Sequence, residues 1–320
     1  MTSTLRLATR RSALAMAQSG MVAAAVTEAT GRPVELVEIT TYGDTSQATG
    51  ESMSQIGGTG VFVSALREAL LAGEVDFAVH SLKDLPTADP AGLALAAVPE
   101  REDVRDVLVA RDGLKLADLP PGARVGTGST RRAAELLLIR PDLEIVAVRG
   151  NVDTRVGFVA SGRVDAVVLA YAGLNRLGRI GEATDLFDPT EFLPSPGQGA
   201  LAIECRAADG ALREILGALE HPPTRAAVVA ERALLATLEA GCSAPVGGYA
   251  LLSPERDGEL TLSGLVAEVV GPEHTGAPAS VRAAHCGPVA EAARIGAELA
   301  TRLLAQGADA LMGATRRASS

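Results

Sequence analysis

Cysteine, lysine and aromatic residues are scarce in this chain of 320 residues, and tryptophan is absent. The three cysteines, Cys205, Cys242 and Cys286, form no CxxC pair and no Cys/His cluster at metal spacing. This argues against a disulfide framework and against a bound metal, and it favours a reducing compartment. Aromatic residues make up 2% of the chain and the formal net charge is −10, so neither stacking rings nor a basic excess is available for nucleic acid.

Long apolar runs are missing as well. No apolar run reaches membrane-spanning length without a charge or a Gly or Pro break, and the N-terminal residues lack the apolar stretch of a secretory signal. The chain is nevertheless 47% hydrophobic, enough to bury more than one core. We expect a soluble, cytoplasmic protein without a membrane partner, and a monomer, because no heptad seam or long apolar edge requires a second copy.

Lysine occurs only at Lys83 and Lys115, so arginine supplies almost all of the 29 basic residues. Arginine binds planar carboxylates through paired hydrogen bonds, whereas lysine presents a compact point charge. Any anionic ligand of this acidic chain must therefore be bound by local groups of arginines.

Apolar runs of strand length alternate with helical stretches, which is the pattern of α/β units with parallel strands. The pattern occurs twice in the same order. Three pairs of segments match: 5–18 with 123–137, 34–44 with 143–151, and 70–85 with 159–174. We predict two similar α/β lobes, and because ligands bind at the carboxyl ends of strands in such sheets, a ligand cleft between the lobes.

Prolines and glycines divide the chain further. The predicted domains are 1–99 with 200–220 (lobe one), 100–199 (lobe two) and 221–320 (a smaller α+β domain). The last should contain a helix over 225–239, a hairpin that turns at Asp257-Gly258 and a closing helix near 288–306.

The loop "HSLKDLPT" (80–87) brings Ser81, Lys83 and Asp84 out of an apolar strand together. A carboxylate beside a lysine at a strand end can act as a general acid or base, or can stabilise positive charge that develops on a substrate. An ordinary surface ion pair explains the same spacing equally well.

The segment "GTGSTRRAAE" (126–135) places Thr127 and Ser129 at a helix start, followed by Arg131 and Arg132. Such a start can bind a carboxylate or phosphate, although an N-cap followed by a solvated basic turn is the plainer interpretation. Other loops of the same kind add arginines: Arg10, Arg149, Arg155 and Arg176. This clustering in an acidic chain favours a ligand with several negative charges.

Cys242 lies in "LEAGCSAPVGGY" (238–249), a glycine-rich turn after a predicted helix. A nucleophile for acyl transfer requires a histidine partner, and none is near in the sequence. Covalent attachment of a prosthetic group is the other use of a single exposed thiol.

Seven segments together resemble the porphobilinogen deaminase (hydroxymethylbilane synthase) family of tetrapyrrole and heme biosynthesis. They are "RLATRRSALAMAQ", "GGTGVFV", "AVHSLKDLPT", "VGTGSTRRAAEL", "RGNVDTRV", "LPSPGQGALAIECR" and "LEAGCSAPVGGYA", which run in chain order from about residue 5 to 250. The resemblance implies two periplasmic-binding-protein-like lobes and a third α+β domain. It also implies a transferase that condenses four porphobilinogens head to tail, with loss of ammonia, onto a dipyrromethane primer and then releases hydroxymethylbilane by hydrolysis.

The resemblance also implies roles for individual residues. Cys242 matches the cysteine that holds the dipyrromethane cofactor by a thioether, and Asp84 matches the catalytic aspartate. Cofactor-binding positions of the family match Lys83, Asp44, Ser81, Thr127, Ser129, Arg131, Arg132 and Arg149. Substrate-binding positions match Arg10, Ser12, Phe62, Arg149, Arg155 and Arg176. One position departs: the family commonly has "GGKG" where this chain has Thr59, so a lysine-dependent function of that loop does not carry over.

Two other functions stay open from the residues alone. A two-lobed binding protein for an organic polycarboxylate would use the same arginines, but it predicts export and leaves Cys242 and the Lys83-Asp84 loop without a role. A thiol-dependent acyltransferase predicts a histidine within reach of Cys242 and no bound chromophore.

Overall fold

The computed structural model describes residues 4–39, 60–88, 90–241, 244–253, 256, 258–271, 274 and 276–312, with only the backbone for 60–62. The chain divides into two compact units. The first comprises Met1–Glu102 and Gly199–Arg225, and the second comprises Asp103–Gln198 and Ala226–Ser320. We call the first unit lobe one, residues 103–198 lobe two, and the rest of the second unit the α+β domain.

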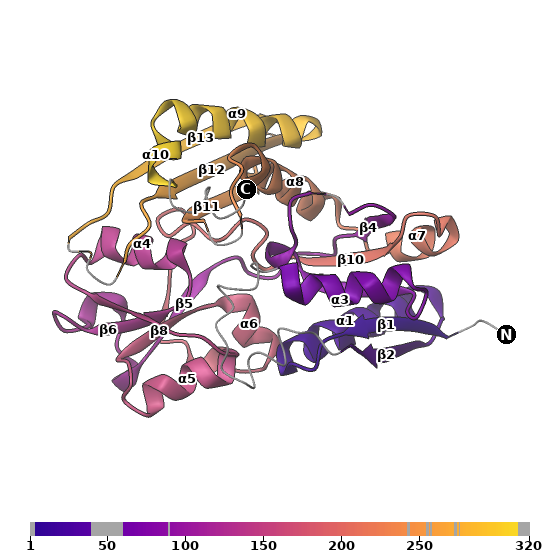
Figure 1. The fold of residues 1–320 in the computed structure, drawn as a ribbon, viewed down its shortest axis with the longest axis horizontal. Coiled ribbons are helices and arrows are strands. Elements are labelled where there is room, and N and C mark those ends of the chain that lie inside the picture. The colour runs from indigo at the N-terminus through magenta and orange to yellow at the C-terminus, as the bar shows by residue number, and fades with distance from the viewer. Residues whose placement is uncertain are drawn as a thin grey trace. The chain divides into compact units, whose positions relative to one another are not determined.

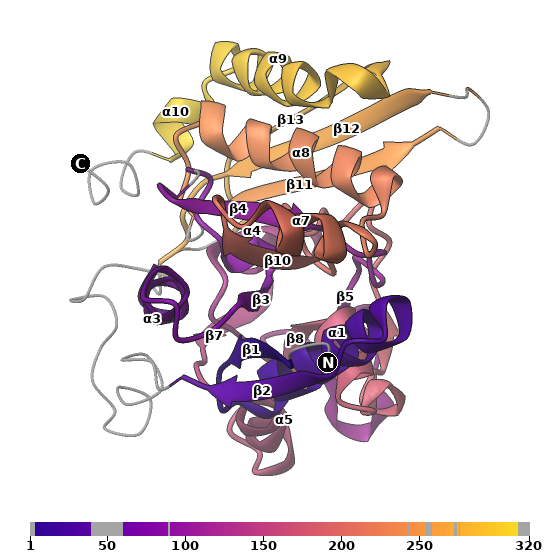
Figure 2. The same ribbon diagram turned by 90° about the vertical axis from the view of Figure 1, so that its right-hand side faces the viewer.

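Within the described residues, lobe one contains a five-stranded sheet with the order β2-β1-β3-β10-β4, which reads from bottom to top in Figure 2. Its strands are β1 (Leu5–Thr9), β2 (Val34–Glu38), β3 (Phe77–Ser81), β4 (Leu93–Ala97) and β10 (Leu201–Arg206). Its helices are α1 (Ala13–Thr30), α3 (Gly60–Leu71), the 3-10 turn η2 (Leu82–Asp84) and α7 (Gly210–Gly217). β1 is parallel to β2 and β3, whereas β10 is antiparallel to β3 and β4.

Both faces of the central strands of this sheet are covered, so β3 and β10 are buried and largely apolar. Successive strand residues point to opposite faces. Leu7 therefore packs with Val22 of α1 and Leu216 of α7, and Ala8 packs on the other face with Leu66 and its neighbours on α3.

Lobe two repeats this architecture. In the described part of the chain its sheet also has five strands, in the order β7-β6-β8-β5-β9. The strands are β5 (Asp106–Ala110), β6 (Arg124–Thr127), β7 (Glu144–Ala147), β8 (Ala166–Ala170) and β9 (Asp185–Leu186). The helices and 3-10 turns are η3 (Arg111–Gly113), η4 (Leu116–Asp118), α4 (Thr130–Ile139), α5 (Val152–Ala160), α6 (Tyr171–Arg176) and η5 (Ile180–Glu182). Figure 1 shows the sheet between α4 and α5, and β6 is again parallel to both neighbours while β5 is antiparallel to β8.

The duplication extends to side-chain contacts. In lobe one, Asp76 accepts a 2.7 Å hydrogen bond from the backbone N–H of Arg6, whose guanidinium donates to the carbonyl of Gly73. In lobe two, Asp165 accepts a 2.7 Å bond from the N–H of Arg124, whose guanidinium donates to the carbonyl of Gly162. The shared G-x-V-D motif thus joins β1 to the loop before β3 in lobe one, and β6 to the loop before β8 in lobe two. The predicted duplication is confirmed.

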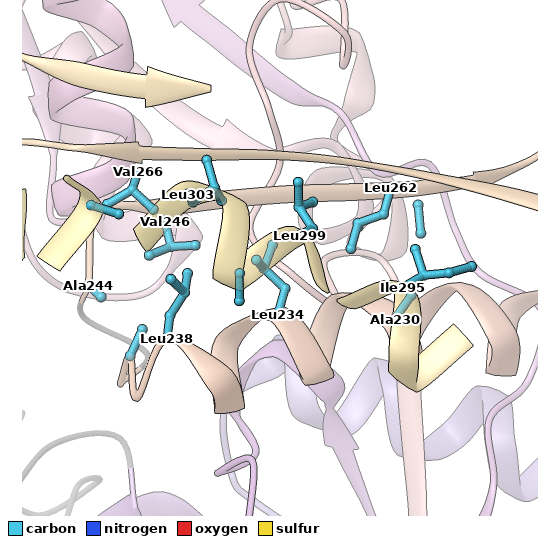
Figure 3. Close-up of a cluster of buried hydrophobic side chains, with 14 of the residues drawn as sticks. Ala230, Leu234, Leu238, Ala244, Val246, Leu262, Val266, Ile295, Leu299 and Leu303 are labelled. Atoms are coloured by element: carbon cyan, nitrogen blue, oxygen red, sulfur yellow. The ribbon is translucent and has the colours of Figure 1, made fainter. Parts of the chain in front are cut away.

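The α+β domain contains, again within the described residues, a three-stranded antiparallel sheet with the order β11-β12-β13. Its elements are α8 (Pro222–Thr237, whose first turn belongs to lobe one), β11 (Val246–Leu252), β12 (Glu259–Ala267), β13 (Ser280–Pro288), η6 (Val289–Glu291), α9 (Ala292–Ala305) and α10 (Ala308–Leu311). Figure 3 shows Leu234 and Leu238 of α8 beside Leu299 and Leu303 of α9 in the core that covers the sheet. The two helices pack closely because α9 has Gly296, where a Cβ would collide with the carbonyl of Ala230.

The predicted hairpin is confirmed by the antiparallel pairing of β11 and β12. Gly258 adopts φ +75°, a left-handed conformation that favours glycine, while Asp257 lies outside the described residues. α8 begins at Pro222, three residues before the predicted start at 225, because proline at the first helical positions loses no helical hydrogen bond.

The predicted fold class is confirmed: two similar α/β lobes accompany a smaller α+β domain. The compact second unit holds lobe two together with the α+β domain, and the predicted three-domain boundaries stay a prediction. In the part of the chain that the structure describes, none of the helices combines the length and the apolar character needed to cross a bilayer.

Candidate active site

The loop that carries Asp84 is anchored on both sides by buried leucines. β3 ends at Ser81, and the N–H of Leu82 donates to the carbonyl of Ala200 at 3.0 Å. Leu82 and Leu85 are buried, whereas Lys83 and Asp84 are half-buried. Among the described residues, the Asp84 carboxylate makes no hydrogen bond or ion pair, so both of its oxygens are available to accept hydrogen bonds from a ligand.

His80, directly before this loop on β3, belongs to a buried triad of polar side chains with Glu204 and Arg67. Nε2 of His80 lies 3.1 Å from Glu204 of β10, and Nη2 of Arg67 on α3 lies 2.7 Å from the same carboxylate. Burial acts to raise the pKa of Glu204, but the hydrogen bonds and charges of His80 and Arg67 outweigh burial and lower it to about 2. Glu204 is therefore ionised at neutral pH, and the triad ties β3 to α3 and β10.

Arg10 and Ser12 follow β1, at the same edge of the sheet as Ser81. Ser12 is the N-cap of α1, and its Oγ accepts a 3.3 Å hydrogen bond from the N–H of Ala15. Arg10 is half-buried. Because β1 and β3 are parallel neighbours, their carboxyl ends place these residues and the Asp84 loop along one edge, as the sequence predicts.

The equivalent edge of lobe two holds Thr127 and Ser129. Oγ1 of Thr127 accepts a 3.1 Å hydrogen bond from the N–H of Ser129, and Oγ of Ser129 caps α4 by accepting from the N–H of Arg132 at 3.4 Å. A Cβ on Gly128 would lie 2.6 Å from the carbonyl of Val148, so only glycine fits there. Each hydroxyl keeps its own proton to donate to an anion.

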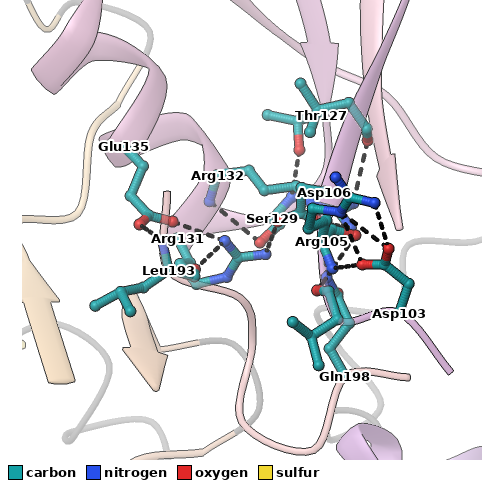
Figure 4. A network of polar contacts seen from close by, with 12 residues as sticks. Asp103, Arg105, Asp106, Thr127, Ser129, Arg131, Arg132, Glu135, Leu193 and Gln198 are labelled. Carbon is teal, nitrogen blue, oxygen red and sulfur yellow. Dashed lines mark hydrogen bonds and ion pairs between the residues drawn. The ribbon is translucent and has the colours of Figure 1, made fainter. Parts of the chain in front are cut away.

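Arg131 and Arg132 both bind Asp106, the first residue of β5, in a fully buried network (Figure 4). Nη2 of Arg131 donates to Oδ2 at 2.6 Å, and Nη2 and Nε of Arg132 donate to Oδ1 at 2.6 and 3.1 Å. The amide of Gln198 donates to the same Oδ1 at 2.8 Å. Burial acts to raise the pKa of Asp106, but the two guanidinium groups outweigh it and hold that pKa well below its ordinary value.

The same network fixes the chain at Leu193. Nη1 of Arg131 donates to the carbonyl of Leu193 and to Glu135, both at 2.7 Å. Glu135 in turn accepts from the N–H of Leu193 at 2.6 Å. Burial raises the pKa of Glu135 to about 7, and the negative charge of Asp106 adds to this effect, while Arg131 opposes it.

Glu135 therefore predicts a pH-dependent stability. Its pKa rises from 4.5 to about 7 on folding, so the folded state retains the proton more strongly than the unfolded chain. The stabilisation is fully present below pH 4.5 and is lost as the pH rises through 7, by at most about 3 kcal/mol. In urea unfolding between pH 5 and 8, Glu135→Gln should remove this decline. Glu144→Gln, at an exposed position on β7, is the control and should keep it. A decline of the same size in Glu135→Gln would contradict the assignment.

The other predicted site arginines of lobe two follow β7 and β8 and add positive charge at this edge of the sheet. Nε of Arg155 donates to the carbonyl of Gly150 at 2.9 Å. Burial and the nearby charge of Arg132 lower the pKa of Arg155 to about 10. Arg149 is exposed, and its side chain makes no hydrogen bond or ion pair with another described residue. Arg176, half-buried, ends α6 after β8. This edge of the sheet therefore carries surplus positive charge.

Two observations test whether the site fits a polycarboxylate. In the described part of the chain, the buried Nε–H of Arg131 has no hydrogen-bond acceptor, and an unmet buried donor is destabilising. The pKa of Arg155 is lowered by burial and, after that, by the nearby charge of Arg132. A bound carboxylate would relieve both, so the residues present fit an anionic cofactor.

Several predicted site residues lie outside the described residues: Cys242, Asp44, Thr59 and the side chain of Phe62. The described chain just before Cys242 is buried at Leu238 and Ala240. Cys205 is buried in the core of lobe one, as its apolar surroundings predict, and Cys286 is exposed on β13.

Asp106 and Glu135 were not among the predicted site residues. Glu135 could have been identified, because Arg131 and Glu135 have the i,i+4 spacing of a helical ion pair. Asp106 carried a weaker signal, a single acid at the start of the apolar run "DVLVA".

Duplicated α/β lobes whose strand ends carry arginines, helix-start hydroxyls and an open carboxylate define a class of protein that binds an organic polyanion. Comparison with known families is specific. Residues 5–214 match the model "Porphobilinogen deaminase, dipyromethane cofactor binding domain", and residues 225–305 match "Porphobilinogen deaminase, C-terminal domain". The chain belongs to the porphobilinogen deaminase family.

Named relatives agree over nearly the full length. The chain is 61% identical to porphobilinogen deaminase 1 of Streptomyces coelicolor, over 97% of each chain. It is 57% identical to the porphobilinogen deaminase of Thermobifida fusca, over 97% of this chain and 96% of that one. Among solved structures, a periplasmic substrate-binding protein of an ABC transporter from Coxiella burnetii aligns with a TM-score of 0.43 and 14% identity, covering 71% of this chain and 96% of the other.

The predicted family is thereby confirmed, and with it a transferase of tetrapyrrole biosynthesis that uses a dipyrromethane cofactor. The binding protein and the acyltransferase are not favoured. The roles of individual site residues stay predictions.

Proposed function

We propose that this protein is a porphobilinogen deaminase that joins four porphobilinogens head to tail on a dipyrromethane primer and releases hydroxymethylbilane by hydrolysis. The observation that carries the proposal is the family match over residues 5–214 and 225–305. The open carboxylate of Asp84 and the surplus of arginines at the strand ends support it, because porphobilinogen carries two carboxylates and develops positive charge when ammonia leaves.

In this proposal Asp84 stabilises charge. A carboxylate without a protein partner accepts hydrogen bonds from pyrrole N–H groups and offsets the positive charge that appears on the ring as the C–N bond breaks. Leu82 and Leu85, buried on either side, fix the turn that presents Asp84. Because the turn is held in advance, little reorganisation is needed when charge develops.

The dipyrromethane, when bound, supplies the nucleophilic carbon at which extension begins. We propose that Cys242 holds it through a thioether. The proposed binding groups for its carboxylates and N–H groups are Asp44, Ser81, Lys83, Thr127, Ser129, Arg131, Arg132 and Arg149. The proposed binding groups for the incoming substrate are Arg10, Ser12, Phe62, Arg149, Arg155 and Arg176.

We also propose that the protein acts as a monomer in the cytoplasm and binds neither nucleic acid nor membrane. The net charge of −10 and the scarcity of aromatic residues support the absence of a nucleic-acid surface. Sedimentation of the purified protein tests the monomer, since a dimer would double the measured mass.

The experiment that tests the function is incubation of the purified protein with porphobilinogen, with ammonia and hydroxymethylbilane measured in the same sample. Four ammonia molecules should be released for each hydroxymethylbilane. Binding of porphobilinogen without release of ammonia would instead support the two-lobed binding protein and refute the enzyme.

Arg149→Ala should impair elongation. Arg149 is exposed and without a partner among the described residues, so its removal leaves a ligand carboxylate unpaired without disturbing the fold. Loss of one charge-assisted hydrogen bond, about 1.5–3 kcal/mol, lowers kcat/KM by about 10- to 100-fold. The matched control is Arg163→Ala, an exposed arginine near the amino end of β8 that stacks on Phe158. Equal kcat/KM in the two variants would show that Arg149 does not bind a ligand carboxylate.

A further inference from the structure

We propose that Asp106 is a positioning residue for cofactor binding: it holds the guanidinium groups of Arg131 and Arg132 side by side, and without it the cofactor is taken up more slowly. The proposal rests on the proposed function, since it concerns uptake of the dipyrromethane. It adds a residue that touches neither substrate nor cofactor but acts through two arginines.

The backbone holds Asp106 in a fixed place. Asp106 is fully buried on β5, where it pairs with Ala170 of β8 and its carbonyl accepts from the N–H of Phe187 at 3.0 Å. Its carboxylate is therefore fixed by a rigid sheet. Oδ2 is assigned to Arg131, while Oδ1 is shared by Arg132 and Gln198, so each arginine has one defined place (Figure 4).

The bonds to Asp106 leave some N–H groups of both guanidiniums available to a ligand. A guanidinium has five N–H groups. Arg132 uses Nε and one N–H of Nη2 on Asp106, and one N–H of Nη1 on the carbonyl of Val168. One N–H is left on each of Nη1 and Nη2. Arg131 uses both N–H groups of Nη1 on Glu135 and Leu193 and one N–H of Nη2 on Asp106. Each arginine therefore keeps two N–H groups for a ligand carboxylate, and the Nε–H of Arg131 has no acceptor among the described residues.

Asp106 also offsets the repulsion between neighbouring guanidinium groups. Arg131, Arg132 and Arg155 lie together, and Asp106 is the carboxylate shared by two of them. Two buried cations repel each other strongly in a medium of low dielectric constant. Asp106 keeps the pair together while a net positive charge remains for the ligand.

Asp106→Asn separates positioning from simple electrostatics because the two predict opposite results. The substitution adds one net positive charge, so if charge alone decided affinity, a polycarboxylate would bind more tightly. The asparagine amide, however, presents an N–H₂ donor where Arg131 needs an acceptor, and the arginines lose their fixed places. Positioning therefore predicts weaker cofactor binding.

The test measures cofactor loading by intact mass. Apo-protein of the wild type and of Asp106→Asn is incubated with porphobilinogen, and the fraction of chains with the added mass is followed over time. We expect loading of Asp106→Asn to be slower by at least about tenfold, the effect of one misplaced charge-assisted contact. The matched control is Asp165→Asn. Asp165 also lies between two arginines, Arg111 and Arg124, but before β8 starts, at the opposite end of that strand.

The loading rates support or refute the proposal as follows. If Asp106→Asn loads as fast as the wild type or faster, the proposal is wrong. If both aspartate variants melt at lower temperature but only Asp106→Asn loads slowly, positioning is supported over a general loss of stability. If the wild type takes up no added mass, the proposed function fails and not this inference.

A second variant covers the case in which Asp106→Asn does not fold. Gln198→Ala removes one hydrogen bond from Oδ1 and leaves both ion pairs. Its loading should be slowed by about tenfold, because the loss of one hydrogen bond to an ionised carboxylate is about 1.5 kcal/mol or more. Loading at the wild-type rate would overturn the proposal on its own.

Discussion

Replacing Asp84 by asparagine is expected to lower kcat by about 10²- to 10³-fold while the substrate still binds through the arginines. The amide has nearly the same shape, so the turn between the buried Leu82 and Leu85 is kept. What is lost is the negative charge. The barrier rises because the positive charge that forms as ammonia leaves has no partner, whereas the ground state loses little.

The measurement is single-turnover formation of hydroxymethylbilane per loaded chain, with loading determined first by intact mass. Asp118→Asn is the matched control, because Asp118 also ends a 3-10 turn, η4, but is exposed and precedes β6, away from the carboxyl ends of the strands. It should keep wild-type turnover. Turnover of Asp84→Asn within about threefold of the wild type would refute the role of Asp84, since removal of a preorganised charge is expected to cost far more.

The duplicated lobes could be predicted from the sequence because the pattern that reveals them is local. A strand, a hydroxyl at the helix start and a G-x-V-D motif recur at matching positions, and the structure shows that this aspartate makes the same bond to β1 in lobe one and to β6 in lobe two. Ser12 and Ser129, both expected at helix starts, are N-caps of α1 and α4. Each of these predictions drew on short segments of the chain.

The network around Asp106 could not be predicted in the same way. Its partners Arg131, Arg132 and Gln198 lie 25, 26 and 92 residues away in the chain. They meet because β5 pairs with β8, β8 pairs with β6, and α4 follows β6. The segment from Leu193 to Gln198 then comes back to the same place, where it contacts Arg131 and Asp106. A pattern in one sequence identifies the arginines as cationic. It does not show that part of their hydrogen-bonding capacity is already taken by a protein carboxylate.

This changes how the arginines of lobe two divide their work. Arg131 gives three of its five N–H groups to Leu193, Glu135 and Asp106, and the same residue lies against Gly247 of β11, where a Cβ would be 3.6 Å from its Cδ. It therefore also supports β11, the strand that follows Cys242 in the chain. Arg149, by contrast, is exposed. We infer that Arg131 has a mainly structural role, whereas Arg149, whose side chain bonds to no other described residue, has only a ligand-binding role.

Cys242→Ser is expected to abolish both the added mass and hydroxymethylbilane synthesis. A serine hydroxyl is a far poorer nucleophile than a thiolate at neutral pH, so the proposed thioether cannot form and the primer is not held. The arginines still attract polycarboxylates, but a ligand held only by reversible contacts leaves between the many steps of elongation. The loss of turnover should therefore exceed that of any single arginine variant.

Intact mass and product formation are measured on the wild type, Cys242→Ser and Cys286→Ser. Cys286 is exposed on β13 and is the matched control for a surface thiol; its variant should carry the full added mass and turn over normally. If Cys242→Ser keeps the added mass while Cys286→Ser loses it, the attachment point is misassigned but the enzyme is not. If neither the wild type nor any variant carries added mass, even after incubation with porphobilinogen, the protein does not use a covalent primer. The proposed role of Cys242 is then wrong.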